Sequence, residues 1–438
     1  TGSYSWTIID AGTLSGFDAN DFGVNFTTLN GQTPTGTFSF SNVSGDLILA
    51  YAAAASVYDV TVAADTAANQ GSAQATNSVA QFTGASALNK LGAGTLIMTN
   101  SANDYTGVTT INEGTLQINV AAPNASAGAL GNASSAVVVG DAAAAAAAGF
   151  NFGEAVTNAR GLSIVAGTGA ADRIISTTFG SGTAAQSGTV VMNTNTTFSI
   201  ASGGTLNVSG VVSGAGTLTK VGAGTLTLSA NNTYTGNTVV GAGTLALGAA
   251  NRIADSSNLT VSNSATFALN NFAESLGSIS GGGTISLGSA TLTSTTTANT
   301  TFSGDITGTG GLVKAGSGTL TLSGSNSYSG TTAVNAGGVV VGDNNAFGSG
   351  VVSLADGTTL SSDASARTLS NNMNIRRIAF EGTGALTLNG NLTNNRGAAI
   401  TVTNSVAGGL TMSNLALSHT TTDRDVTLAG SGNTTING

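Results

Sequence analysis

The stretch "KVGAGTLTLSANNTYTG", residues 220–236, decides the fold because it occurs three times in the chain. The other copies are "KLGAGTLIMTNSANDYTG" at 90–107 and "KAGSGTLTLSGSNSYSG" at 314–330. Each copy begins with one of the only three lysines in the protein and ends near a tyrosine. Such strict placement of scarce residues marks either one structural unit or one reactive device that is used three times.

Spacing within and after each copy indicates a solenoid. The "GTL" signature recurs from Gly94 to Gly114, from Gly224 to Gly243 and, in diverged form, from Gly318 to Gly338, which is a period near 20 residues. Within "GTLTLS" the leucines alternate with threonines, as in a half-buried strand. Short strands renewed at a fixed period are typical of solenoid coils. The sequence therefore predicts an all-β, parallel β-helix with about 20 residues per coil.

Composition supports a folded, helix-poor chain and excludes several functions. Charged residues make up 7% of the 438 residues, against about 25% in ordinary domains. With 63 glycines and two prolines, the turns must be made by Gly, Asn and Ser. The net charge of −9 argues against nucleic acid as a partner. No apolar run is long enough for a membrane-spanning helix, and no cysteine is available for disulfides or metal.

Larger matches divide the chain into segments. "SGVVSGAGTLTK" at 209–220 aligns with "SGDITGTGGLVK" at 303–314, which indicates repeated modules of several coils. We predict a Phe-rich β segment at 1–60 and modules at 61–206, 207–302 and 303–438, the last with an open C-terminal end. The first module is the longest, so we expect an insertion near 141–190 that forms a loop or short helix outside the stack. The chain begins at Thr1 without an apolar leader, so any signal peptide would already have been removed.

The repeated lysine and tyrosine admit two interpretations. In the structural one, the lysine lays its stem along the solenoid with its charge in water, or donates to carbonyls left free at a corner, and the tyrosine covers the interior with its hydroxyl in solvent. In the reactive one, the lysine forms a cross-link or repeated ligand site, which needs a buried acid that the three copies do not share. The structural reading covers the following repeat residues: Lys90, Gly94, Leu96, Tyr105, Lys220, Gly224, Leu226, Tyr234, Lys314, Gly318, Leu320 and Tyr328.

The motif resembles the autotransporter-associated β-strand repeat, also called the passenger-associated transport repeat. The residues that carry the resemblance in the second copy are Lys220, Gly222, Gly224, Thr225, Leu226, Leu228, Tyr234, Gly236 and Thr238. The likeness covers most of residues 80–350. It implies a right-handed β-helix on a large secreted or surface-attached bacterial protein, in which the repeat is a structural stalk.

Both ends of the chain prompt a hypothesis of head-to-tail assembly with itself. Solenoid ends normally need a polar cap, and residues 431–438 contain neither a charge nor a proline. The first segment is rich in large aromatic residues that could dock onto the open end of another copy. The candidate assembly residues are Trp6, Phe17, Phe22, Phe26, Phe38 and Phe40. A contact of this kind would build an extracellular filament.

Two other functions stay open. An adhesin passenger would bind its target, such as cell-surface or matrix glycans, on the insertion near 141–190 or on the end near 394–425. A polysaccharide-active β-helix would need clustered carboxylates, and the candidates are Asp423, Arg424 and Asp425 beside the only histidine, His419. "DANDFG", with Asp18 and Asp21, lacks the ligands of a calcium loop. We therefore expect a structural protein without catalytic residues, metal or cofactor.

Overall fold

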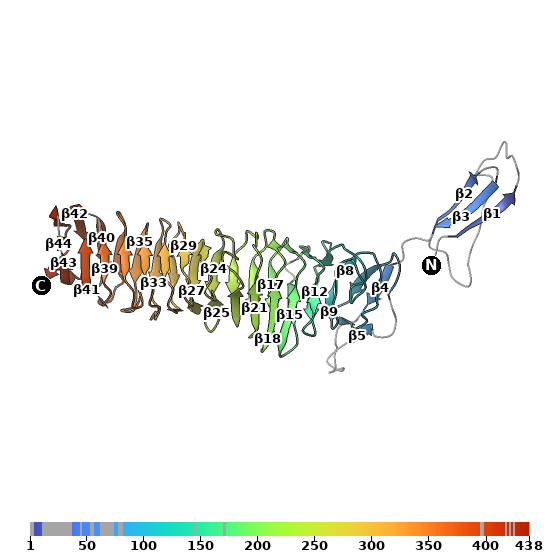
Figure 1. Ribbon diagram of the computed structural model, residues 1–438, viewed down its shortest axis with the longest axis horizontal. Coiled ribbons are helices and arrows are strands. Elements are labelled where there is room, and N and C mark those ends of the chain that lie inside the picture. Colours follow the sequence, from blue (N-terminus) through green and yellow to red (C-terminus); the bar gives the residue numbers. More distant parts are fainter. Residues whose placement is uncertain are drawn as a thin grey trace.

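The computed structural model describes residues 4–10, 37–43, 46–52, 57–61, 74–77, 82–143, 145–169, 172–394, 398–416, 418–419, 422–423 and 425–437. Every regular element in these ranges is a β-strand. Parallel strands stack one behind another along a rod (Figure 1). The rod has about 16 coils of about 21 residues. The predicted all-β parallel solenoid is confirmed.

The rod has three faces, and one of them, the continuous face, is an unbroken parallel ladder. Neighbouring coils pair there in register throughout; for example, Leu218 lies opposite Thr196 and Thr238. Its strands are β5 (Gln74–Asn77), β7 (Thr95–Met98), β9 (Gly114–Ile118), β11 (Ala148–Phe152), β14 (Arg173–Thr177), β17 (Thr196–Ser199), β20 (Leu218–Val221), β22 (Thr238–Val240), β24 (Asn258–Val261), β27 (Ser278–Gly281), β30 (Thr300–Phe302), β33 (Thr319–Leu322), β35 (Gly338–Val341), β37 (Thr359–Ser362), β40 (Ile378–Gly382), β42 (Ile400–Asn404) and β46 (Val426–Ala429).

The second face carries its longest ladder in the middle of the rod. Its strands are β12 (Thr157–Asn158), β15 (Gly182–Gln186), β18 (Gly204–Val208), β21 (Thr225–Leu228), β23 (Thr244–Leu247), β25 (Thr266–Ala268), β28 (Thr284–Ser286) and β31 (Asp305–Thr307). Along the chain, each coil visits the third face, then the continuous face, then the second face. The second-face ladder therefore begins after the first motif copy and ends before the third.

The third face consists of two ladders with a gap between them. The first holds β4 (Val57–Thr61), β6 (Ala87–Leu91), β8 (Thr109–Ile111), β10 (Val137–Val139), β13 (Leu162–Ile164), β16 (Val190–Met192) and β19 (Val212–Ser213). The second holds β26 (Glu274–Leu276), β29 (Leu292–Ser294), β32 (Leu312–Lys314), β34 (Thr332–Val334), β36 (Val352–Leu354), β38 (Arg367–Leu369), β39 (Met373–Ile375), β41 (Leu386–Asn394), β43 (Leu410–Ala416) and β47 (Thr434–Ile436). Strand β41 pairs with both β38 and β39, so it runs across two faces. Its first part forms a short second-face ladder with β38, the first part of β43 and β47, and its last part continues the third face from β39.

The core is a set of aliphatic ladders inside the coils. Leu226 lies opposite Leu206 in the preceding coil and Leu245 in the next, and all three side chains are fully buried. Leu96 and Leu320, the equivalent repeat leucines, are buried in the same way. Full burial of each such side chain contributes about 2 kcal/mol to folding. The strand alternation read from "GTLTLS" is thus the inside–outside alternation of the rod.

The structure corrects the expected insertion near 141–190. The alanine run ends in β11, which pairs with β9 before it and β14 after it, so these residues are coils of the stack. A strand forms because Phe150 and Phe152 supply inward positions at the required alternation. The extra length of the first module comes instead from long coils. Val138 pairs with Thr110 and Leu162 pairs with Val190, each 28 residues away.

One repeat glycine was also aligned one residue too late. Gly337, and not Gly338, is the counterpart of Gly114 and Gly243, because all three have φ between 64° and 69°. A Cβ on Gly337 would lie 2.3 Å from the Gly318 carbonyl oxygen of the preceding coil. The position therefore requires glycine for both its left-handed backbone and its closeness to that coil.

The N-terminal segment is β-rich as predicted. β1 (Tyr4–Asp10), β3 (Asp46–Ala52) and β2 (Thr37–Val43) form an antiparallel sheet in that order. Trp6 lies in β1, and Phe38 and Phe40 lie in β2. The other candidate assembly residues, Phe17, Phe22 and Phe26, lie outside the described residues. The modular boundaries at 60, 206 and 302 stay predictions.

Candidate functional site: the repeated corner and an outer groove

Each motif lysine is an internal corner clamp. Lys220 is fully buried, and its ammonium donates to the carbonyl oxygens of Val221 and Gly222 at 2.8 Å and of Ala242 at 3.1 Å. These carbonyls lie at the corner where two successive coils turn, and that of Val221 also accepts the Ile200 N–H of the preceding coil at 3.0 Å. The other copies repeat this arrangement: Lys90 to Leu91, Gly92 and Glu113, and Lys314 to Gly316 and Ala336.

This geometry selects between the two predicted placements of the lysine. The expectation of a charge held in water is wrong, because all three lysines have no exposed surface. The alternative, donation to free corner carbonyls, is confirmed. Burial lowers the pKa of Lys220 to about 8, which still leaves an ammonium at neutral pH. Only the ammonium has three N–H donors for three carbonyls.

Each motif tyrosine is buried as well. The prediction that its hydroxyl reaches solvent is wrong. The Tyr234 hydroxyl shares a 2.7 Å hydrogen bond with Thr238 Oγ1, which in turn lies 3.0 Å from Ser257 Oγ in the next coil. Tyr105 with Thr109 and Tyr328 with Thr332 form the same pair at 2.7 Å and 2.6 Å. Burial raises the pKa of Tyr234, so the phenol stays protonated.

Sequence reasoning missed an asparagine two residues before each tyrosine. The Asn232 side chain accepts the Val212 N–H from the preceding coil at 2.8 Å and donates to the Arg252 carbonyl of the next coil at 2.8 Å. It thereby replaces a strand in the gap of the third face. The signal was available as the pattern N-x-Y in all three copies, and the other members are Asn103 and Asn326.

The loop after each motif is held from the following coil by a buried side chain. The three holding groups have different chemistry: a guanidinium, a carboxylate and an amide. Arg160 Nε donates to the Ser135 carbonyl at 3.0 Å, and Asn371 Nδ2 donates to the Gly350 carbonyl at 2.8 Å. The Glu274 carboxylate accepts the Arg252 N–H at 2.8 Å. Arg160 and Asn371 lie at equivalent positions, two residues before Leu162 and Met373, whereas Glu274 lies five residues before the equivalent Ile279. The three modules share neither the residue nor its exact position, so no repeat pattern reveals it.

Glu274 is the only one of these three holding groups that ionises near neutral pH. Its side chain is 2% exposed. Burial raises the pKa of Glu274 to about 7, against the opposing effect of the N–H groups of Arg252, Ile253 and Ser275, and Asp255 adds to the rise.

The motif changes faces along the rod. Lys90 in β6 and Lys314 in β32 end strands of the third face, whereas Lys220 lies in β20 of the continuous face. The face without a strand is accordingly the second, the third and again the second. This one-face shift, together with the long coils of the first module, accounts for the unequal lysine separations of 130 and 94 residues. The motif is therefore a portable corner unit that closes two coils around a gap in one ladder.

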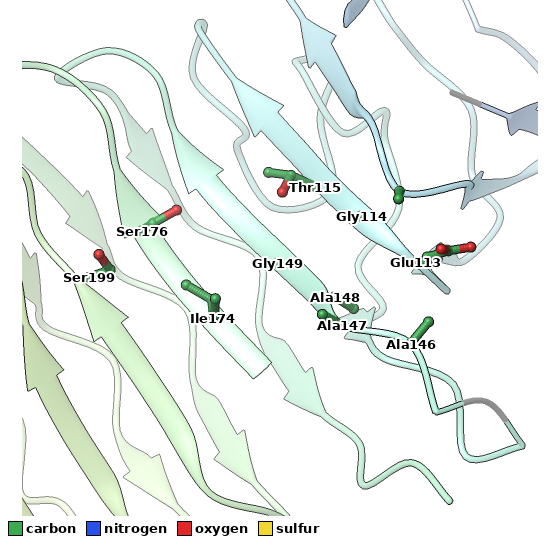
Figure 2. A pocket seen from close by; sticks show the side chains of 11 residues that line it. Glu113, Gly114, Thr115, Ala146, Ala147, Ala148, Gly149, Ile174, Ser176 and Ser199 are labelled. Carbon is green, nitrogen blue, oxygen red and sulfur yellow. The ribbon is translucent and has the colours of Figure 1, made fainter. Parts of the chain in front are cut away.

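A shallow groove of about 470 Å³ lies on the outer side of the continuous face (Figure 2). It crosses β9, β11, β14 and β17. Figure 2 shows Ser199, Ser176, Ile174 and Thr115 on these strands and Glu113 with Ala146 toward the corner. Six of its eleven lining residues fall in the 141–190 region that the adhesin hypothesis singled out, and the other five are Ala93, Glu113, Gly114, Thr115 and Ser199.

The residues proposed for polysaccharide chemistry are not assembled into a described site. His419 and Asp423 lie in β44 (Ser418–His419) and β45 (Thr422–Asp423), an antiparallel pair in which Ser418 is opposite Asp423. Arg424, Asp18 and Asp21 lie outside the described residues, and Asp425 is exposed. Within the described ranges, no cluster of three His, Asp or Glu side chains suits a metal ion. The same ranges contain no helix that meets the length and hydropathy of a membrane span.

Comparison with known proteins agrees with the corner geometry. The family model of the passenger-associated transport repeat matches residues 88–118, 218–247 and 312–341, which are the three corner units and their second coils. The chain is 41% identical over 253 residues to the adhesin BmaC autotransporter of Brucella suis biovar 1 (strain 1330). That match covers 57% of this chain and 6% of the relative. No solved structure matches.

The three matched segments coincide with the buried lysine, asparagine and tyrosine contacts, so sequence family and structure identify the same unit. The likeness to an autotransporter adhesin also makes this a secreted or cell-surface protein. The chain is a parallel β-solenoid that contains three passenger-associated transport repeats.

Proposed function

We propose that this chain is a non-catalytic part of an adhesin passenger, a stiff extracellular stalk that presents binding surfaces on its sides. The carrying observation is that the motif polar side chains are buried and bonded inside the rod. Lys220, Asn232, Tyr234 and Thr238 all bridge or close coils, which leaves none of them for chemistry on a substrate. The 41% identity to a named autotransporter adhesin supports the same role.

The test combines imaging, adhesion and turnover on the purified chain. We expect straight rods in negative-stain electron microscopy, retention of the protein on beads coated with a neutral-glycan glycoprotein, and no release of reducing sugar from those glycans. Release of reducing sugar that disappears in Asp423→Asn would contradict the non-catalytic assignment. Retention no greater than that on albumin-coated beads would contradict the adhesive role.

We further propose that an additional coil stacks on the last described one, and head-to-tail pairing of two copies is one way to supply it. Leu428 and Ile436 continue the inward columns of Val402 and Met412 but are 38% and 47% exposed. Concentration-dependent filaments that Leu428→Asp and Ile436→Asp abolish would support pairing of copies. A monomer at all concentrations would contradict it.

A further inference from the structure

The outer groove exists because one strand lacks a side chain at an outward position. Along that column, Gly149 of β11 lies between Thr115 and Ile174 of the neighbouring strands. A Cβ on Gly149 would meet its nearest atoms at 3.4 Å and 3.6 Å, and the residue has no left-handed φ. Neither backbone conformation nor space therefore requires glycine here. Because Gly149 has no side chain, its backbone forms the floor of the groove.

The groove is lined by hydroxyl groups that have an ordered amide network beside them. Ser176 Oγ donates to Asn151 Oδ1 at 2.9 Å, and Asn151 Nδ2 donates to Gln117 Oε1 at 2.8 Å and to Thr178 Oγ1 at 3.1 Å. Asn151 is 3% exposed, so this network is fixed before any ligand arrives. It holds the Ser176 hydroxyl in a set orientation at the edge of the groove.

The corner end of the groove carries its one charged side chain. The Glu113 carboxylate is half-buried and makes no hydrogen bond or ion pair with any described residue. Its backbone carbonyl accepts a hydrogen bond from the Lys90 ammonium at 3.0 Å, which holds the backbone of this corner, and the same ammonium attracts the carboxylate. The carboxylate oxygens are acceptors for ligand hydroxyl or ammonium groups.

Shape and charge together define the ligand class. A shallow site with hydroxyls, one carboxylate and an apolar part made of Ile174 and four alanines matches a pyranose ring, which offers hydroxyls at its edge and C–H groups on its face. Phosphates and acidic sugars are disfavoured, because Glu113 is the only charge in the lining and the chain has a net charge of −9. An acyl chain is disfavoured because the groove is shallow and cannot enclose it.

We propose that this groove binds a neutral or amino-substituted pyranose at the end of a glycan, with Glu113 and Ser176 as its polar contacts and Ile174 beneath the ring. The inference deepens the proposed adhesive function and depends on it for its role in the whole protein. The Gly149 floor determines which ring fits.

The experiment titrates the full chain with methyl glucoside, glucosamine and N-acetylneuraminic acid by saturation-transfer NMR and calorimetry. We expect glucosamine to bind about tenfold more tightly than methyl glucoside, and N-acetylneuraminic acid not to bind. Gly149→Val fills the floor and should weaken both sugars at least tenfold. Thr219→Val, in the same outward column on β20, is the matched control and should change nothing. Glu113→Gln should remove the preference for glucosamine.

Two outcomes would overturn the assignment: no binding of either expected sugar, or equal binding by wild type and Gly149→Val. Bead adhesion separates the two proposals. Wild-type adhesion that survives Gly149→Val overturns the groove and leaves the adhesive role standing. Sugar binding through the groove without adhesion of the rod overturns the adhesive role and leaves the groove standing.

Discussion

A fully buried lysine in an apolar rod is stable because the corner needs what an ammonium offers. Where the chain turns from one face to the next, the carbonyls leave the ladder and would otherwise be buried without donors. Three carbonyls surround Lys220 and three surround Lys90, and among them that of Val221 also accepts the Ile200 N–H. At Lys220 the charge is thus compensated by dipoles, and at Lys90 the Glu113 carboxylate adds an electrostatic attraction.

Lys220→Met tests this compensation. The substitution keeps the apolar stem and removes the three donors, so the carbonyls of Gly222 and Ala242 lose this partner, whereas that of Val221 keeps the Ile200 N–H. We expect a loss of about 3 kcal/mol in unfolding free energy, because each unsatisfied buried group costs about 1–3 kcal/mol. Urea unfolding followed by circular dichroism measures it, with the outward Thr219→Met as control. An unchanged midpoint would show that water replaces the ammonium.

Tyr234 and Thr238 should behave as one unit. Tyr234→Phe keeps the ring and removes the 2.7 Å hydrogen bond, at a cost of about 1 kcal/mol. Thr238→Val removes the same bond and also the contact with Ser257, and should cost more. In a double-mutant cycle the two effects should be less than additive. Simple additivity would contradict the pairing.

At the scale of elements, each motif replaces a missing strand by a side-chain bridge and a loop held from the next coil. Asn232 performs the bridging in the gap of the third face. The loop-holding residue differs in chemistry between modules because any buried donor or acceptor that is long enough to contact the loop backbone suffices. Arg160, Glu274 and Asn371 are three solutions of this kind.

The carboxylate solution makes the middle module sensitive to pH. Because the pKa of Glu274 is about 7 in the folded chain and about 4.5 when unfolded, the folded state binds the extra proton between these values. The contribution of Glu274 to the unfolding free energy should therefore be fully present below about pH 4.5. It should fall by about 3 kcal/mol as the pH rises from 4.5 to above 7. Urea midpoints from pH 4.5 to 8 measure the trend. Glu274→Gln should abolish it, and the exposed Glu381→Gln should not.

The sequence was sufficient for what is periodic and insufficient for what is not. Leu226 and Leu228 alternate with threonines, so strands, coil length and core were predictable. The buried state of Lys220 was not decidable, because nothing in its neighbours shows which carbonyls leave the ladder. Gly337 was misaligned since Gly338 follows it directly, and only φ distinguishes them. The groove depends on Gly149 lying beside Thr115 and Ile174, a register between coils of unequal length.

Over the whole molecule, stability should be local, because each coil contacts mainly the coils before and after it. Lys220→Met should therefore speed amide hydrogen exchange in β17 to β24 and leave β36 to β42 at wild-type rates. Exchange followed by mass spectrometry resolves these segments. Equal acceleration along the entire rod would instead indicate a single cooperative unit.

The uninterrupted ladder of the continuous face determines how the rod carries load. Its strands lie across the long axis, so tension along that axis would part their hydrogen bonds one rung at a time. Coils loaded in this way separate first at the weakest contact between neighbours. Where the other faces lack strands, Asn232 and its counterparts form hydrogen bonds with both the preceding and the next coil, and Lys220 joins two successive coils at a corner. The gaps are thus reinforced by side chains, and a stretched rod should separate between them.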